Sequence, residues 1–289
     1  MKTIFVVGAG FMGSGIAQVC AQSGYEVFLM DVNQQALDRA LEGIRWSVGK
    51  LSTKGFIKEP PEIVVQRIVT ATNLEKSAAA DWVIEAAIED EALKLKIFRE
   101  LDQLAPVHTP LATNTSSIPI TRIARVTKNP NRVLGLHFFG PVPFMGLVEV
   151  VKGEKTSSEI FDLGVDFVQS LGKKPVKVRK DIPGFVMNRI FSAAFKECVE
   201  LVSEGIVSPA DIDLGMRLGY GWNVGPFEIA DNAGLDTFVR VGESMRALGE
   251  EHLVVTSDLL QSMVQEGRLG KKTGRGFYRY TQDGKKRKD

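Results

Sequence analysis

Cysteine and histidine are scarce in this sequence, and neither sign of charge is in excess. The 289 residues include two cysteines and three histidines, and 36 Lys and Arg stand against 35 Asp and Glu. Cys20 and Cys198 lie in helix-like stretches and have neither the spacing of a metal site nor that of a redox motif. A dedicated nucleic-acid binder would carry a basic excess. The composition therefore predicts no metal centre and no nucleic-acid partner.

A long apolar run is also missing. No run approaches the roughly 18–20 residues that a membrane-spanning helix needs. The apolar stretch at residues 4–7 is too short for a signal peptide and leads straight into a glycine-rich segment. We therefore expect no membrane partner and a cytoplasmic location. With 44% hydrophobic and 25% charged residues, the chain has the composition of a folded globular protein, and its length suggests two domains.

Short apolar strands alternate with helical patterns over the first half of the chain. The strands are expected at residues 3–7, 27–30, 82–86, 111–113, 133–136, 147–151 and 175–178, and the helices between them at 11–22, 35–51 and 91–104. This alternation predicts a parallel sheet covered by helices on both faces. Helical periodicity takes over after about residue 183, where Pro183 and Gly184 interrupt the pattern. We therefore expect an α/β domain at 1–182 and an all-α domain at 183–289.

A glycine-rich turn joins the first strand to the first helix. Residues 8–13 have the pattern G-x-G-x-x-G. Gly8 permits the tight turn, Gly10 lets the backbone approach a pyrophosphate, and Gly13 allows close packing of helix and strand. The N-terminus of the helix then presents free N–H groups to phosphates. Together with the strand–helix alternation, the motif predicts a Rossmann-type doubly wound sheet that binds a dinucleotide.

An acidic residue follows the second strand. Asp31 lies 18 residues after Gly13, where a carboxylate accepts hydrogen bonds from the adenosine ribose. The same carboxylate would repel a 2′-phosphate, so Asp31 favours NAD over NADP. FAD uses the same glycine motif, so the motif alone does not choose the chemistry.

One of the three histidines has a placement typical of catalysis. His108 lies in a proline-flanked loop and His252 on a solvated segment, so we expect both at the surface. His137 directly follows the strand at 133–136. Ligands of open α/β sheets bind outside the carboxyl ends of strands, which makes His137 a candidate catalytic residue. A packed core histidine is the alternative.

Glu149 supports the catalytic interpretation of His137. It lies among apolar neighbours in the strand at 147–151, and a buried glutamate is rare unless it is paired. A strand–turn–strand from 137 to 149 would bring the two side chains together. The carboxylate would then fix the imidazole tautomer and stabilise its protonated form. A structural ion pair is the alternative.

Two polar stretches are candidates to complete the site. Residues 113–117 follow the strand at 111–113, with Ser116 among them; the alternative is the N-cap of a following helix. Residues 183–189 begin the second domain and place Asn188 in an otherwise apolar turn. The alternative for this turn is a capped domain junction.

These features together resemble the L-3-hydroxyacyl-CoA dehydrogenase family, and most closely its short-chain, single-function bacterial members. The resemblance covers essentially the whole chain and is specific because many motifs occur in one order. The matching segments are residues 7–13, 84–89, 114–117, 137–143, 147–150, 183–189, 225–228 and 270–278.

The resemblance implies a role for each matched residue. The aligned histidine of the family is the catalytic base and the aligned glutamate its partner, which implies these roles for His137 and Glu149. The aligned serine and asparagine contact the region of the reacting oxygen, which implies Ser116 and Asn188. The NAD contacts implied by the family and the glycine motif are Gly8, Gly10, Phe11, Met12, Gly13, Asp31, Glu89, Lys94, Ser116 and Lys272.

The resemblance also implies an acyl-CoA substrate. The family's CoA contacts lie on a helical hairpin after the second strand, which implies Ser47 and Lys54, the latter as a point charge for a phosphate. A solvated lysine is the alternative. The expected reaction is NAD-dependent oxidation of a short-chain (S)-3-hydroxyacyl-CoA. A 3-hydroxyadipyl-CoA dehydrogenase, a dehydrogenase of free hydroxy acids and a non-catalytic NAD-binding structural protein are the alternatives.

One position departs from the family pattern. Many members have asparagine where this chain has Gly140, which removes a polar contact from the site. The family's helical second domain usually forms a homodimer, and this implies a homodimer here.

Overall fold

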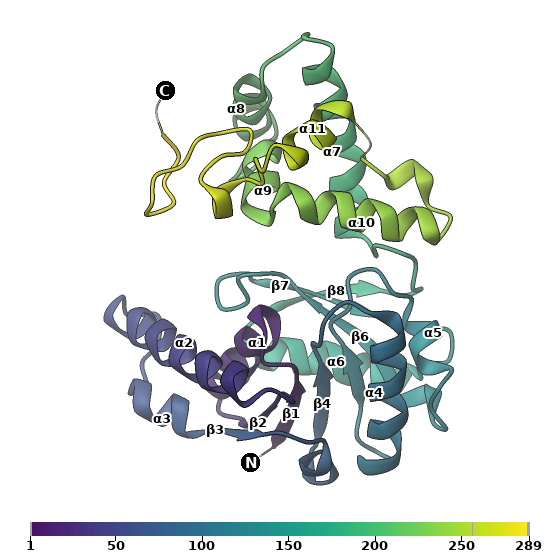
Figure 1. Ribbon diagram of the computed structural model, residues 1–289. Coiled ribbons are helices and arrows are strands. Elements are labelled where there is room, and N and C mark those ends of the chain that lie inside the picture. Colours follow the sequence, from purple (N-terminus) through teal and green to yellow (C-terminus); the bar gives the residue numbers. More distant parts are fainter. Residues whose placement is uncertain (1, 256, 288–289) are drawn as a thin grey trace. The chain divides into compact units, whose positions relative to one another are not determined.

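Eight strands from the first part of the chain form one sheet (Figure 1), in the order β3-β2-β1-β4-β5-β6-β7-β8. The strands are β1 Thr3–Val7, β2 Glu26–Met30, β3 Ile68–Ala71, β4 Trp82–Glu85, β5 Leu111–Thr113, β6 Val133–Phe138, β7 Leu147–Val151 and β8 Lys174–Val178. Neighbouring strands are parallel except for β6 and β7, which pair antiparallel. The α/β class expected from the alternation of strands and helices is confirmed.

The strand order reverses at β1. The chain passes from β1 to β2 and β3 on one side and then returns to β4 on the other. Parallel crossovers are right-handed, so connections that run in opposite directions along the sheet cover opposite faces. Helix α1 (Phe11–Gln22) accordingly lies on one face of the sheet and α4 (Glu91–Leu104) on the other (Figure 1). Ligands of open sheets bind at such a reversal, outside the carboxyl ends of the strands.

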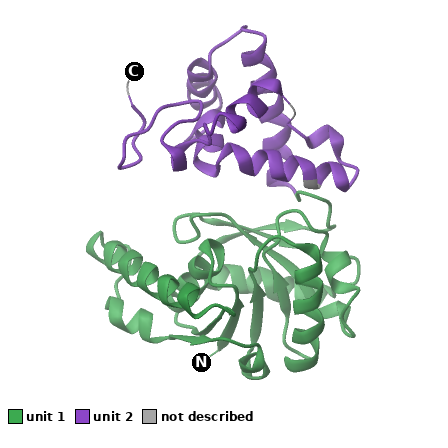
Figure 2. Ribbon diagram, in the orientation of Figure 1, with its two compact units in different colours: residues 1–185 green, residues 186–289 purple. Residues whose placement is uncertain are grey.

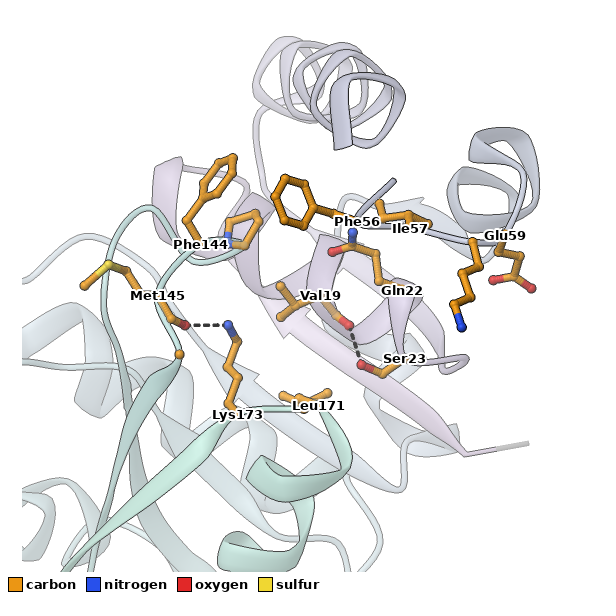
Figure 3. Close-up of a pocket in the computed structure, with 14 residues that line it drawn as sticks. Val19, Gln22, Ser23, Phe56, Ile57, Glu59, Phe144, Met145, Leu171 and Lys173 are labelled. Atoms are coloured by element: carbon orange, nitrogen blue, oxygen red, sulfur yellow. Dashed lines mark hydrogen bonds between the residues drawn. The ribbon is translucent and has the colours of Figure 1, made fainter. Parts of the chain in front are cut away.

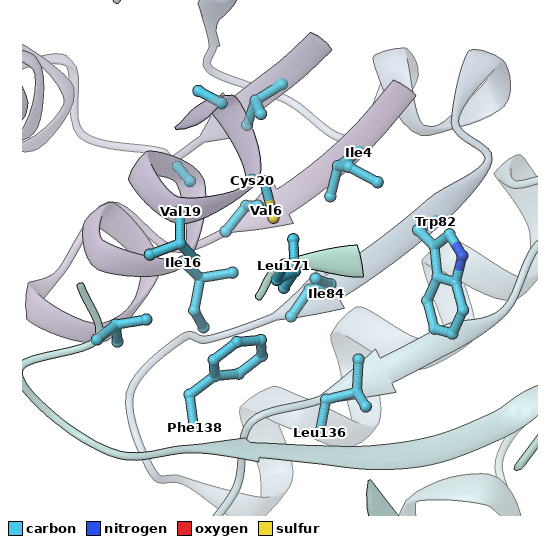
Figure 4. Close-up of a cluster of buried hydrophobic side chains, with 14 of the residues drawn as sticks. Ile4, Val6, Ile16, Val19, Cys20, Trp82, Ile84, Leu136, Phe138 and Leu171 are labelled. Atoms are coloured by element: carbon cyan, nitrogen blue, oxygen red, sulfur yellow. The ribbon is translucent and has the colours of Figure 1, made fainter. Parts of the chain in front are cut away.

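The first unit buries an apolar core between the sheet and its helices (Figure 4). Its other α-helices are α2 Gln34–Thr53, α3 Pro61–Gln66, α5 Ile120–Ala124 and α6 Ser158–Ser170, and its 3-10 turns are η1 Glu75–Ala79 and η2 Pro130–Arg132. Trp82 stacks on Phe167 at 4.7 Å between ring centroids, which joins β4 to α6. Asn33, Asp90 and Ser157 accept backbone N–H bonds at the starts of α2, α4 and α6, so short polar side chains fix where these helices begin.

Two strands differ from the sequence-based expectation. Strand β3 was not predicted, because it is a four-residue edge strand of which only Ile68 is buried. Strand β6 extends to Phe138 instead of ending at Leu136, so His137 lies inside the strand and not after it. The reason is the antiparallel ladder, in which His137 and Phe138 still pair with residues of β7.

The structure describes residues 2–255 and 257–287. The chain divides between residues 185 and 186 into two compact units (Figure 2). Helices of the second unit are α7 Met187–Ser203, α8 Pro209–Tyr220, α9 Pro226–Ala233, α10 Leu235–Ala247 and α11 Asp258–Gln265, with 3-10 turns η3 Glu251–Leu253 and η4 Lys271–Thr273. Phe195 and Phe227 are at the centre of its aromatic core. Within these described residues, no helix has the length and apolar character needed to cross a membrane. Nor are three or more His, Cys, Asp or Glu side chains grouped there so as to hold a metal ion.

Two buried aspartates hold the end of the second unit in place. Asp231 accepts hydrogen bonds from the backbone N–H groups of Phe277 (3.0 Å) and Tyr278 (2.9 Å). Asp213 accepts bonds from the Phe227 N–H (2.9 Å) and the Tyr278 hydroxyl (2.7 Å). Burial raises the pKa of both carboxyl groups above the usual range. The segments 225–228 and 270–278 that contributed to the family resemblance therefore meet at these two side chains.

The contact with Asp231 explains why residue 276 is a glycine. A Cβ on Gly276 would overlap the Asp231 carboxylate, so we expect Gly276→Ala to lower the melting temperature, with a cost of about 1–3 kcal/mol for overpacking. Differential scanning calorimetry of the whole protein measures this. Gly219→Ala in α8 is the matched control, because its added Cβ meets no atom within 4 Å. Equal melting temperatures for the parent and Gly276→Ala would contradict the account.

Candidate functional site

The glycine turn has the geometry of a phosphate-binding loop. Gly8 has a φ of 100°, and a Cβ there would come within 2.6 Å of the Ala86 carbonyl oxygen. A Cβ on Gly13 would overlap the Gly8 carbonyl oxygen, so helix and turn meet without a side chain between them. Above Gly10, by contrast, the space within 4 Å of an added Cβ is open. The turn is thus closed on its protein side and open where a pyrophosphate would approach the start of α1.

Asp31 lies directly after β2 and is tied to this turn. Its Oδ2 accepts a hydrogen bond from the Ala9 N–H (2.9 Å) and its Oδ1 one from the Asn33 N–H (2.9 Å). The carboxylate is therefore held next to the glycine turn while remaining only partly buried. The residues around the turn fit a dinucleotide whose ribose hydroxyls donate to Asp31.

His137 and Glu149 form a buried pair. They face each other in the β6–β7 ladder, and His137 Nδ1 lies 2.7 Å from Glu149 Oε2. Both side chains are buried, and the rings of Phe139 and Phe185 lie 4.6 and 5.6 Å from the imidazole, centroid to centroid. A carboxylate can only accept, so Nδ1 carries the proton and Nε2 is left with a lone pair. This arrangement would leave Nε2 able to accept a proton, with the imidazole held beside two aromatic rings.

The segment after β5 is fixed by one carboxylate. Oε1 of Glu89 accepts bonds from the Thr115 hydroxyl (2.5 Å), the Ser116 N–H (3.0 Å), and the N–H and hydroxyl of Ser117 (3.2 and 3.0 Å). Asn114 Oδ1 accepts from the Phe138 N–H at 2.9 Å, which joins the segment to the strand that carries His137. The alternative of a helix N-cap is wrong, because α5 begins after Pro119 without a side-chain cap.

Glu89 is charged at neutral pH. Burial alone would raise the pKa of its carboxyl group, but the charge of Lys94 and the bonds from Thr115, Ser116 and Ser117 outweigh burial and hold it below the usual range. The Ser116 N–H thus donates to an anion, and hydrogen bonds to charged groups are the stronger kind.

Lys94 and Glu85 form a second buried pair behind Glu89. Lys94 is 1% exposed, and its Nζ lies 2.6 Å from Glu85 Oε1 and 3.4 Å from Glu89 Oε2. The sequence interpretation did not assign a role to Glu85. The signal was there, since Glu85 is a charge at the end of an apolar strand, which was also the argument for Glu149.

The residues expected to contact CoA lie on α2. Ser47 accepts a hydrogen bond from Gln18 Nε2 at 3.0 Å, and Lys54 is exposed at the C-terminal end of the helix. A cavity of about 440 Å³ opens nearby, between α1, residues 56–59, the turn at 143–146 and residues 171–173 (Figure 3). Its floor includes Lys173, which donates to the carbonyl oxygens of Val142 and Met145. Neither Ser47 nor Lys54 lines this cavity.

Asn188 and Lys272 belong to the second unit. Asn188 is the second residue of α7, and Lys272 lies in η4 with its Nζ 2.5 Å from Asp236 Oδ1. The other two histidines, His108 and His252, are exposed, as expected.

Gly140 lies against the start of α1. A Cβ at this position would come within 2.6 Å of the Phe11 ring and 3.3 Å of Met12 Sδ. The Phe11 ring lies against the backbone of Gly140. The rest of the Phe11 side chain has few contacts, since the residue is 70% exposed. An aromatic ring therefore lies against Gly140, the position that departs from the expected family pattern.

Comparison with known proteins gives the same assignment for both units. Residues 3–182 match the model of the 3-hydroxyacyl-CoA dehydrogenase NAD binding domain, and residues 184–280 match that of the 3-hydroxyacyl-CoA dehydrogenase C-terminal domain. The chain is 44% identical over 276 residues to a probable 3-hydroxybutyryl-CoA dehydrogenase of Deinococcus radiodurans, covering 95% of this chain and 99% of the relative.

Two further relatives are informative. The crystal structure of (S)-3-hydroxybutyryl-CoA dehydrogenase PaaH1 from Ralstonia eutropha is similar with a TM-score of 0.90 and 39% identity, covering 98% of this chain and 100% of that one. A 3-hydroxyadipyl-CoA dehydrogenase of Escherichia coli is 41% identical over 280 residues, which are 96% of this chain but 59% of the relative.

Proposed function

Because the chain belongs to the 3-hydroxyacyl-CoA dehydrogenase family, we propose that it oxidises short-chain (S)-3-hydroxyacyl-CoA, 3-hydroxybutyryl-CoA first among them, with His137 as the base. The family is NAD-dependent, and NAD is the cofactor of this enzyme. The observation that carries the mechanism is the buried His137–Glu149 pair at the carboxyl edge of the sheet.

The chain's own residues move the proton. Bound NAD would supply the acceptor for the hydride that leaves C3 of the substrate. His137 takes the proton of the 3-hydroxyl at Nε2, and Glu149 stabilises the imidazolium through Nδ1. The family resemblance implies that Ser116 and Asn188 each contact the region of the reacting oxygen. In the reverse direction protonated His137 returns the proton to the 3-oxo group, so oxidation, which releases a proton, is favoured at higher pH.

The cofactor site of this proposal is the glycine turn with Asp31. Phe11 and Met12 begin α1, whose start would receive the pyrophosphate; Glu89 lies in the loop after β4, and Lys94 lies near the start of α4. The family resemblance implies Lys272 as a further cofactor contact.

Substrate assays distinguish this proposal from three other functions. A 3-hydroxyadipyl-CoA dehydrogenase and a dehydrogenase of free hydroxy acids differ in the acyl pocket, and the adipyl relative is nearly as similar as the butyryl one. A non-catalytic NAD-binding protein has no use for a buried His–Glu pair. Oxidation of NADH with acetoacetyl-CoA, followed at its absorbance band, tests the class. Thioesters of C4, C6 and C10 acids and of 3-oxoadipate then test the chain length.

We also propose a homodimer formed through the second unit, and a cytoplasmic location. Exposed apolar side chains gather in α8 and beside it, and exposed patches of this kind mark interaction surfaces. They are Ile206, Leu214, Leu218 and Tyr220.

Substitution of His137 tests whether it is the base. General acid–base catalysis supplies about 10²–10⁴ in rate, so His137→Ala should slow hydride transfer by that order. Glu149→Gln should slow it too, and the double variant should be little worse than His137→Ala, because residues that act as a unit are not additive. Stopped-flow measurement gives the rates. NADH affinity, checked by fluorescence, should stay unchanged.

The control for this prediction is His108→Ala, which removes an exposed histidine from a loop at the amino edge of the sheet. It should keep the parental rate. A His137→Ala variant with near-parental hydride transfer would rule out the mechanism.

A further prediction concerns Asp31. Its carboxylate should repel a 2′-phosphate, so the parent should have a much higher kcat/KM with NADH than with NADPH. Asp31→Ser should lower the ratio of kcat/KM with NADH to kcat/KM with NADPH. Steady-state assays with both cofactors measure it. A parent that already prefers NADPH would show that the interpretation of Asp31 is wrong.

The proposed CoA contact at Lys54 is tested by comparing substrates. Lys54→Ala should raise KM for acetoacetyl-CoA more than for the pantetheine thioester that lacks the nucleotide phosphates, because only the former offers an anion to the ammonium group. Lys96→Ala on α4 is the control, since Lys96 is exposed on the other face of the sheet. Equal losses with both substrates would favour a merely solvated lysine.

A further inference from the structure

Glu85 is a completely buried carboxylate that the mechanism does not use. It is the last residue of β4, where Val7 of β1 and Thr113 of β5 are its neighbours across the sheet. Its Oε1 accepts from Lys94 Nζ (2.6 Å) and the Ala87 N–H (2.7 Å), and its Oε2 accepts from the Thr113 hydroxyl (2.7 Å). The three donors come from three different segments of the chain.

One side of this network reaches the glycine turn. By accepting from Ala87, Glu85 fixes the peptide that joins Ala86 to Ala87. The Ala86 N–H donates to the Val7 carbonyl at 2.7 Å, and the Ala86 carbonyl is the atom that leaves no room for a side chain on Gly8. A shift of the loop after β4 would therefore move the wall against which the turn is packed.

The other side reaches the segment that carries Ser116. Thr113, which donates to Glu85, accepts from the Thr115 N–H at 3.2 Å. Lys94, which donates to Glu85, lies 3.4 Å from Glu89, and Glu89 holds the Ser116 N–H at 3.0 Å. Two separate routes thus connect Glu85 to the same short segment.

Stability alone is a poor account of such a pair. Burial removes both charges from water, and replacing a buried ion pair by apolar residues of similar size is often neutral or stabilising. The pair instead fixes geometry. Three hydrogen bonds hold the Glu85 carboxylate in one orientation, and its donors are held with it.

We propose that Glu85 is a positioning residue that holds the loop after β4 and the segment after β5 in the one arrangement that binds the nicotinamide dinucleotide productively. The inference rests on the proposed function, because it assigns the cofactor to the edge where both segments end. Glu85 acts through Ala87, Lys94 and Thr113 and touches no substrate.

The test is Glu85→Gln, which keeps the size of the side chain and removes its charge. The Kd for NADH should rise about tenfold or more and kcat should fall, because buried donors lose their acceptor. KM for acetoacetyl-CoA should stay near the parental value, since the proposed CoA contacts lie on α2. Fluorescence titration and steady-state kinetics are measured well below the melting temperature of the variant.

A matched control separates position from stability. Asp102 and Arg132 form another buried ion pair in the same unit, 2.8 Å apart and each 3% exposed. Arg132 directly precedes β6, so this pair lies at the amino edge of the sheet, away from the cofactor side. Asp102→Asn should lower the melting temperature but leave the Kd for NADH unchanged.

Thr113→Val provides a second variant if Glu85→Gln does not fold, because it removes only a hydroxyl from the network. It should weaken NADH binding by a few fold, with the same unchanged KM for acetoacetyl-CoA. Parental NADH affinity in the folded variants, or equal loss of affinity in Asp102→Asn, would overturn the proposal. A parent that neither binds NADH nor reduces acetoacetyl-CoA would instead refute the proposed function.

Discussion

The antiparallel pairing of β6 with β7 is the interaction on which the candidate site depends. It is the one antiparallel pair in the described sheet, and it brings the chain back so that Glu149 lies opposite His137. A slip of one residue would turn the Glu149 side chain to the other face and leave a carboxylate buried without a partner. The β6–β7 register and the His137–Glu149 pair therefore stabilise each other. The register also sets the tautomer of the imidazole, because it places the carboxylate next to Nδ1.

Much of this arrangement was predictable because it is local in the sequence. The glycine turn, Asp31 and the pairing of His137 with Glu149 rest on spacings that translate directly into turn, strand end and hairpin. The extension of β6 was not predictable, because it depends on bonds to a second strand. Edge strand β3 was not predicted for a related reason. A short strand with one buried residue has no clear pattern of apolar residues in the sequence.

For Glu89 and Lys94 the sequence indicated a role but not the surroundings of the side chains. The family resemblance implied both as cofactor contacts, and the structure adds that Lys94 is buried between two carboxylates. Spacing within α4 cannot reveal this, because Glu85 and Glu89 are on a strand end and a loop. The proximity arises only when β4 enters the sheet.

Carboxylates, buried at Glu85 and Asp231 and partly exposed at Glu89, have one common use in both units. Glu85 accepts from Ala87, and Glu89 from Ser116 and Ser117; in the second unit Asp231 does the same for the segment at 277–278. Each carboxylate accepts hydrogen bonds from backbone N–H groups that lie outside the strands and helices. An apolar side chain has no acceptor atom and would leave these groups unpaired. Irregular segments in each unit are thereby fixed by specific side-chain acceptors. Catalysis needs such definition, because a displaced orienting group costs rate even when every catalytic side chain is present.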